Sequence, residues 1–170
     1  SAFQMILCGG ETLIDFIPTE AKDGALAYRP ANGGSVHNVA LALGRLDVPV
    51  GFVGGISTDF FGEALASGLE ANRVSTAHVR RLDRPTTLAF VKLSGGEARY
   101  AFFDEGAADR SWSLADLPEV GPDVTALQFG GISLIRQPAA DAYAALMQRE
   151  AGRRVISFDP NIRPNIVRDE

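Results

Sequence analysis

The sequence has little cysteine and little histidine: one cysteine, Cys8, and two histidines among 170 residues. A single cysteine forms no disulfide within the chain, and this composition is typical of a reducing compartment, so we expect a cytoplasmic protein. The histidines and the cysteine stand far apart, without the spacing of a zinc site. We therefore predict no metal ligands in this chain, and disulfide-rich secreted folds are excluded.

Basic charge and long apolar runs are also scarce. The net charge is −5, and no cluster of Lys and Arg stands out, which argues against a nucleic-acid partner or an anionic membrane surface. No apolar run approaches the ~20 residues of a membrane-spanning helix, and we expect no signal peptide. With 46% hydrophobic and 22% charged residues, the composition is that of an ordinary globular domain.

Three familiar motifs are missing. The sequence contains no P-loop, no glycine-rich dinucleotide fingerprint after its first strand, and no strand-to-helix nucleophile elbow. These absences mean that the residues alone do not define a reaction.

What is present is an alternation of strands and helices. Buried strands are expected at 5–8, 48–53, 124–129 and 154–158, and helices at 36–46, 60–72 and 138–151. This order predicts an α/β fold with a mostly parallel sheet and flanking helices. Further strands are expected at 12–17, 77–82 and 87–93, the last pairing with 99–103 in a hairpin. Asp59 is a good N-cap for the second helix.

Polar residues follow several of these strands. "GGE" ends the first strand, and "FGG" at 129–131 and "DPNIRP" at 159–164 end two others. Because ligands bind beyond the carboxyl ends of parallel strands, we expect Asp15, Asn161 and Arg163 to surround one cleft.

The first helix has a bare and polar entrance. Gly33 and Gly34 allow close approach of another group, and Asn38 falls in the first turn, where N–H groups are unpaired and the dipole is positive. This entrance suits hydroxyls or negative charge. The alternative is a tight strand-to-helix turn in which Ser35 is the N-cap.

Each of the other polar candidates also has a simpler interpretation. Asp15 alone is explained by an edge-strand carboxylate that faces water, and Asn161 and Arg163 by a proline-flanked turn. The aromatic residues within 99–103 are explained by cross-strand packing. His37 is explained by a solvated or core-edge histidine.

Four stretches taken together resemble a known family. Residues 31–65, 9–16, 98–109 and 157–164 occur in the order of the amino-terminal motifs of the ribokinase-like (PfkB) carbohydrate kinases, closest to the bacterial fructokinase-like branch. The resemblance implies a ribokinase-like fold and a transfer of the ATP γ-phosphate to a primary hydroxyl of a sugar, usually with Mg²⁺.

The resemblance also implies roles for single residues. Asp15 matches the aspartate that binds sugar hydroxyls, Gly33 and Gly34 match a diglycine against which the sugar lies, and Asn38 matches an amide donor. Asn161 and Arg163 match a stretch near the transferred phosphate, where the arginine fork suits phosphate oxygens.

A small β lid over the sugar is implied as well. It comprises residues 12–31 together with 86–104, with Phe102 as its apolar cover. We expect the uncovered face of the lid sheet to pair two copies of the chain as a homodimer.

Three positions depart from the family pattern. Asp104 stands where kinases of acidic sugars tend to carry a basic residue, so we expect it in the substrate site, favouring a neutral sugar such as fructose. Gly130 stands where ribokinases carry a carboxylate, and His37 is not a usual family residue, so its role is open. A nucleoside kinase or a 2-keto-3-deoxygluconate-type kinase stays an alternative.

The family's glycine-rich anion hole and catalytic aspartate have no match in residues 1–170. We therefore expect this chain to be the amino-terminal part of a longer kinase, with the general base and the ATP site elsewhere. The alternative is a non-catalytic sugar-binding fragment that ends at Glu170.

Overall fold

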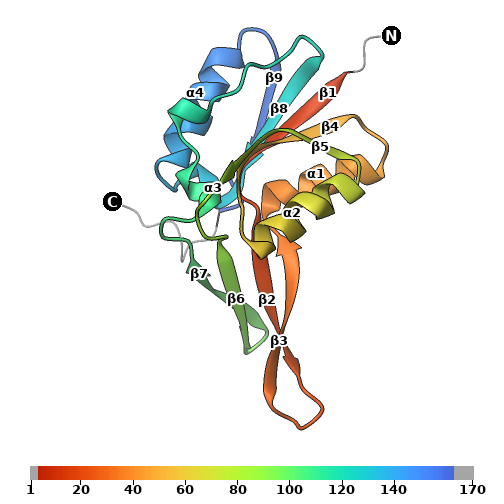
Figure 1. Cartoon of the computed structure of the whole chain (residues 1–170), viewed down its shortest axis with the longest axis vertical. Coiled ribbons are helices and arrows are strands. Elements are labelled where there is room, and N and C mark those ends of the chain that lie inside the picture. The colour runs from red at the N-terminus through yellow and green to blue at the C-terminus, as the bar shows by residue number, and fades with distance from the viewer. Residues whose placement is uncertain (1–3, 163–170) are drawn as a thin grey trace.

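Five parallel strands form the central sheet of the computed structural model, which describes residues 4–162 (Figure 1). Their order is β5-β4-β1-β8-β9, and every neighbouring pair is parallel. The strands are β1 (Met5–Gly9), β4 (Val50–Ser57), β5 (Val74–Leu82), β8 (Val124–Gly130) and β9 (Val155–Asp159). The predicted α/β fold with a mostly parallel sheet is confirmed.

Helices cover both faces of this sheet. One face carries α1 (Ser35–Arg45) and α2 (Phe60–Ala71), and the other carries α4 (Ala139–Glu150) and the short α3 (Ala108–Ser111) (Figure 1). Single 3-10 turns, η1 (Leu114–Asp116) and η2 (Gly131–Leu134), complete the connections. None of the helices in residues 4–162 is long and apolar enough to cross a membrane.

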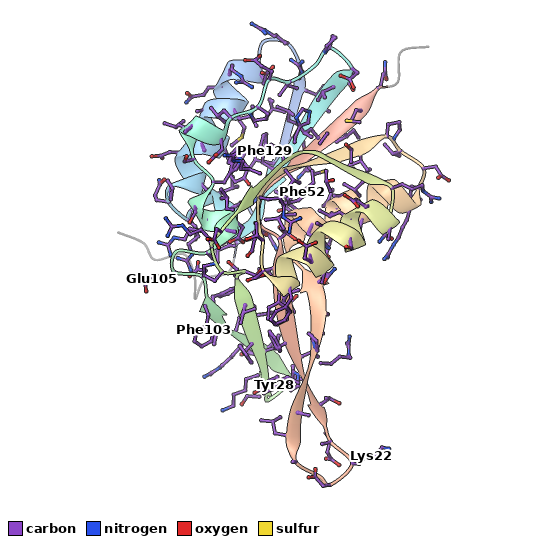
Figure 2. All side chains as sticks on the ribbon, viewed as in Figure 1. Lys22, Tyr28, Phe52, Phe103, Glu105 and Phe129 are labelled. Atoms are coloured by element: carbon purple, nitrogen blue, oxygen red, sulfur yellow. The ribbon has the colours of Figure 1, made fainter. Side chains whose placement is uncertain are left out.

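Strand β1 shows why the sheet is covered on both sides. Leu7 packs in the core with Phe129 under α4, while its neighbour Cys8 packs with Phe52 under α1 and α2. Successive side chains of a strand point to opposite faces, so an apolar strand must be covered twice. Figure 2 shows Phe52 and Phe129 inside this body.

A second sheet projects from the body (Figure 1). Its order is β3-β2-β6-β7, formed by β2 (Leu13–Glu20), β3 (Leu26–Gly33), β6 (Leu88–Ser94) and β7 (Glu97–Phe103). β2 and β6 are parallel and the other two pairs are antiparallel, so the predicted hairpin is confirmed. Strand β3 was not predicted, because it contains Pro30, which is unusual within a strand, and because nearly all of its side chains are at least partly exposed.

The predicted helices match the observed ones to within one residue at each end. Strand β5 begins at Val74, three residues before the predicted start, and β4 continues to Ser57. Asp59 caps α2 as expected, because its Oδ1 accepts a hydrogen bond from the Gly62 N–H at 2.8 Å.

Candidate functional site

A cavity of about 430 Å³ lies between the carboxyl edge of the central sheet and the second sheet. It is lined by residues that follow strands of the central sheet, by the start of α1, and by the inner face of the second sheet: Glu11, Leu13, Asp15, Gly34, Ser35, Asn38, Tyr100, Phe102, Gly131, Ile132, Leu134, Ile135, Pro160, Asn161 and Ile162. The structure thus brings Asp15 and Asn161 to one cleft, as was expected from the rule that ligands bind beyond the carboxyl ends of parallel strands. Arg163 lies outside the described residues.

Asp15 is a half-buried carboxylate in the wall of this cavity. It stands on β2 between Ala31 of β3 and Ala89 of β6, so it does not lie on an edge strand. Burial raises the pKa of its carboxyl. Within residues 4–162 its side chain makes no hydrogen bond or ion pair.

Both positions directly before α1 require glycine. At Gly33 a carboxylate oxygen comes too close for a side chain, and at Gly34 the backbone conformation also favours glycine. A Cβ on Gly33 would lie 2.1 Å from Oδ2 of Asp15, so this glycine makes room for the carboxylate. Gly34 has a φ of 114° and a Cβ there would lie 2.7 Å from the Glu11 carbonyl oxygen. Gly34 lines the cavity and Gly33 stands behind Asp15.

Glu11 is the site residue that the sequence reasoning missed. It is 3% exposed, and its Oε1 accepts hydrogen bonds from the N–H and the hydroxyl of Ser35, at 3.0 and 3.1 Å. Its Oε2 accepts the N–H of Ser133 at 3.3 Å. Burial raises the pKa of this carboxyl, although the hydrogen bonds oppose the shift. The "GGE" that contains Glu11 was expected at the carboxyl end of the first strand, but Glu11 itself was given no role.

The alternative in which Ser35 is the N-cap of α1 does not match the structure. Ser35 is the first helical residue, and the N-cap position is occupied by Gly34. Because glycine has no side chain, the N-cap residue accepts no hydrogen bond from the helix through a side chain. The Glu11 carboxylate accepts the free Ser35 N–H instead, from 24 residues away. Asn38 is then exposed in the first turn, where it lines the cavity.

Aromatic and aliphatic side chains form the apolar part of the wall. Tyr100 and Phe102 of β7 stack with their ring centroids 5.9 Å apart, and both line the cavity. Ile132 and Ile135 line it from the segment after β8. Phe103 lies on the other face of the second sheet and contacts Phe90. Phe102 was singled out from the sequence, whereas Tyr100 was explained only by strand packing.

Asp104 does not line this cavity, which corrects the expected contact with substrate. Its Oδ2 lies 2.9 Å from Nε of Arg136, and its Oδ1 lies 3.6 Å from Nη1 of Arg110. These three residues border a separate, much smaller cavity beside the first. The two cations engage the Asp104 carboxylate, so it faces them instead of the larger cavity.

His37 is fully buried, which overturns the interpretation as a solvated residue. Its Nδ1 lies 2.9 Å from the hydroxyl oxygen of Thr12, and Nε2 has no hydrogen-bond partner among the residues that the structure describes. Burial lowers its pKa to about 4, so the ring is neutral near pH 7. His37 does not line the large cavity.

Comparison with known proteins identifies the family to which the chain belongs. The profile of the pfkB family carbohydrate kinases matches residues 4–168, and the chain belongs to this family. With it the ribokinase-like fold expected from the sequence is established, since the most similar folds include solved fructokinases.

Several relatives are named fructokinases. The chain is 49% identical over 166 residues to a fructokinase of Rhizobium leguminosarum bv. trifolii, covering 98% of this chain and 51% of the relative. It is 34% identical to probable fructokinase-7 of Arabidopsis thaliana, covering 94% of this chain and 48% of the relative. The chain therefore spans about half the length of the curated relatives that it matches.

Solved structures of fructokinases have a similar fold. A crystal structure of fructokinase from Xylella fastidiosa superposes with a TM-score of 0.88 at 31% identity, covering 98% of this chain and 53% of that one. A second structure of a Xylella fastidiosa fructokinase, with bound ATP, has a TM-score of 0.87 at 30% identity.

Proposed function

We propose that this chain is the amino-terminal part of an ATP-dependent fructokinase, which transfers the γ-phosphate to a primary hydroxyl of a neutral sugar such as fructose. The observation that carries the proposal is the Asp15 carboxylate, unpaired within the described residues and set in a cavity with stacked aromatic rings. Carboxylates accept hydrogen bonds from hydroxyls, and ring faces pack against the C–H surface of a sugar. Similarity to fructokinases supports the choice of sugar.

We assign a role in sugar binding to each part of the cavity lining. Asp15 accepts hydrogen bonds from sugar hydroxyls, Asn38 donates one, and the Gly34 backbone forms part of the floor. The second sheet, from segments 12–31 and 86–104, acts as a lid, and Phe102 covers the sugar and excludes water during transfer.

The phosphate side of the reaction involves fewer described residues. Asn161 lines the same cavity, and we propose that it and Arg163 lie near the transferred phosphate. We propose that the general base and the ATP site lie outside residues 1–170. Phosphoryl transfer depends on positioning and charge stabilisation, so both parts are needed for turnover.

Mg²⁺ usually accompanies ATP in such a transfer. Residues 4–162 contain no group of three or more acidic, histidine or cysteine side chains that could hold a metal ion. Glu11, the other carboxylate in the cavity wall, is already bonded to Ser35 and Ser133. We therefore assign no Mg²⁺ ligand to the described residues.

Charge in the cavity favours a neutral sugar over an acidic one. Its described lining includes the carboxylates Glu11 and Asp15 and no Lys or Arg. A substrate carboxylate would be repelled there without a compensating cation. A 2-keto-3-deoxygluconate-type kinase, a nucleoside kinase and a non-catalytic sugar-binding fragment are the competing assignments.

A substrate panel with the complete kinase tests the proposal. ADP formation is measured with ATP and, in turn, fructose, 2-keto-3-deoxygluconate and adenosine. We expect the highest kcat/KM with fructose. Preference for the acid sugar or the nucleoside would select a competing kinase. An intact mass of the native protein equal to that of residues 1–170 would select the non-catalytic fragment.

We also propose a homodimer through the second sheet, in the cytoplasm. Leu26, Tyr28 and Phe103 lie on the face of this sheet opposite Asp15, and they are 70%, 39% and 62% exposed. Figure 2 shows Tyr28 and Phe103 on this sheet. Exposed apolar patches of this kind mark interaction surfaces. Light scattering on the purified kinase should give twice the monomer mass, and a monomer mass would contradict the dimer.

A further inference from the structure

The end of strand β7 is tied to the body of the molecule by charge. Asp104 directly follows β7, and its side chain is only 16% exposed. Its Oδ2 lies 2.9 Å from Arg136 Nε in an ion pair that lacks the alignment of a hydrogen bond. Arg110 stands on the other side of the carboxylate, 3.6 Å from Oδ1.

This ion pair joins two walls of the large cavity. Phe102, two residues before Asp104, lines it from the second sheet. Ile135, the neighbour of Arg136, lines it from the segment after β8. Arg110 supports the same segment, because its Nε donates to the Gln137 carbonyl at 3.0 Å. A shift of Asp104 would therefore change the distance between the two walls.

Strand β7 has little else to fix its position. In the part of the chain that the structure describes, it lies at the edge of the second sheet and pairs only with β6. Most of its side chains are exposed. The smaller cavity beside Asp104 is also lined by Glu11 and Asp109.

We infer that Asp104 and Arg136 form a latch that holds β7, with Phe102, in position over the sugar cavity. Both are positioning residues that act on the sugar through the cavity wall, without touching it. Because the two charges are largely shielded from water, salt screens their attraction less than that of a surface pair. The inference rests on the proposed sugar kinase function.

The test uses three variants of the complete kinase: Asp104→Asn, Arg136→Gln and the double variant. We expect each single variant to raise the KM for fructose about fivefold with kcat changed less than twofold, and the double variant to resemble the single ones. Thermal unfolding checks that the variants are folded. Asp47→Asn, which breaks the exposed Arg73–Asp47 pair at 3.2 Å, should leave the KM unchanged and serves as the matched control.

Two kinetic results would overturn the latch. An effect of Asp104→Asn without one of Arg136→Gln would make Asp104 a direct sugar ligand, and strictly additive effects would make the two residues independent. Wild-type KM values in all three variants would also overturn it.

Hydrogen exchange keeps the latch testable even if the kinase has a different substrate. Amides 97–103 should exchange faster in Asp104→Asn and in Arg136→Gln than in the wild type or in Asp47→Asn. Unchanged exchange would refute the latch, whereas absence of fructose turnover in the wild type would refute only the proposed function.

Discussion

Two carboxylates enter the cavity wall within five residues of each other, and their surroundings give them different roles. Glu11 is buried and accepts three hydrogen bonds, which join the end of β1 to the start of α1 and to the segment after β8. Asp15 accepts none from the described residues and faces the cavity. Glu11 therefore shapes the floor, and Asp15 is left to bind a ligand.

The first prediction concerns Asp15. Asp15→Asn in the complete kinase should lower kcat/KM for fructose about tenfold or more and leave the KM for ATP nearly unchanged, because a charge-assisted hydrogen bond contributes ~1.5–3 kcal/mol. Steady-state kinetics measure both. Glu20→Gln, at the exposed end of the same strand, is the control. Normal fructose kinetics in Asp15→Asn would show that this carboxylate does not bind the sugar.

The second prediction concerns Glu11. Glu11→Gln keeps the size of the side chain but replaces one accepting oxygen by a donor that faces Ser35 or Ser133. The free energy of unfolding should fall by about 1–3 kcal/mol, because a buried donor is left unsatisfied. Urea unfolding measures the loss, again with Glu20→Gln as control. Wild-type stability would mean that the Glu11 bonds contribute nothing net.

Residues whose chemistry is local could be predicted from the sequence, whereas residues that depend on distant partners could not. Asp15 and Asn38 stood out by position alone. Glu11 acts through Ser133, 122 residues away, and the partner of Asp104 is Arg136, so neither role was visible in a short window. The alternative with Ser35 as N-cap likewise did not foresee that the Glu11 carboxylate accepts the first N–H of α1.

At the scale of elements, periodic segments were predictable and exposed ones were not. The apolar spacing in α1, α2 and α4 predicted the ends of these helices to within one residue. Strand β3 has no buried face to produce alternation, and its place is set by pairing with β2 over eight residues. This pairing crosses only the short connection 21–25, but it leaves no clear apolar alternation in β3 from which the strand could be predicted.

The third prediction follows from the contact between α3 and the start of β6. The Thr87 hydroxyl donates to Oδ1 of Asp109 at 2.6 Å, and burial, as the main cause, raises the pKa of Asp109 to about 7. A raised acid pKa stabilises the fold below the ordinary value of 3.8 and loses that contribution as pH rises through about 7. His37, whose pKa is lowered, acts in the opposite direction.

The measurement therefore compares Asp109→Asn with the wild type. Asparagine keeps an acceptor for Thr87 but does not ionise. Urea unfolding at pH 5 and pH 8 should show that the variant gains stability relative to the wild type by a few kcal/mol on going to the higher pH. An equal difference at both pH values would contradict the assignment of the raised pKa to Asp109.

The fourth prediction concerns the second sheet as a lid. Amide exchange in residues 88–103 should slow when fructose is added to the complete kinase, because closure over the sugar orders β6 and β7. Amides of α4, on the body, are the internal reference. Identical exchange with and without fructose would rule out a lid that closes on the sugar.

At the scale of the whole molecule, the two sheets have different roles at the cavity. The central sheet and α1 provide a rigid floor, since their cores are packed on both faces, and the second sheet provides the wall that projects from it (Figure 1). Family membership and fold were both accessible from the order of the motifs, and the choice of fructose rests on similarity to fructokinases together with the charge of the cavity.

A crystal structure of the complete kinase with fructose shows directly whether this cavity is the sugar site. We expect fructose in the cavity between the two sheets, with hydroxyls within hydrogen-bond distance of the Asp15 carboxylate and the Asn38 amide, and with Phe102 against the sugar ring. Fructose bound at another place, or bound in this cavity without contact to Asp15, would contradict it.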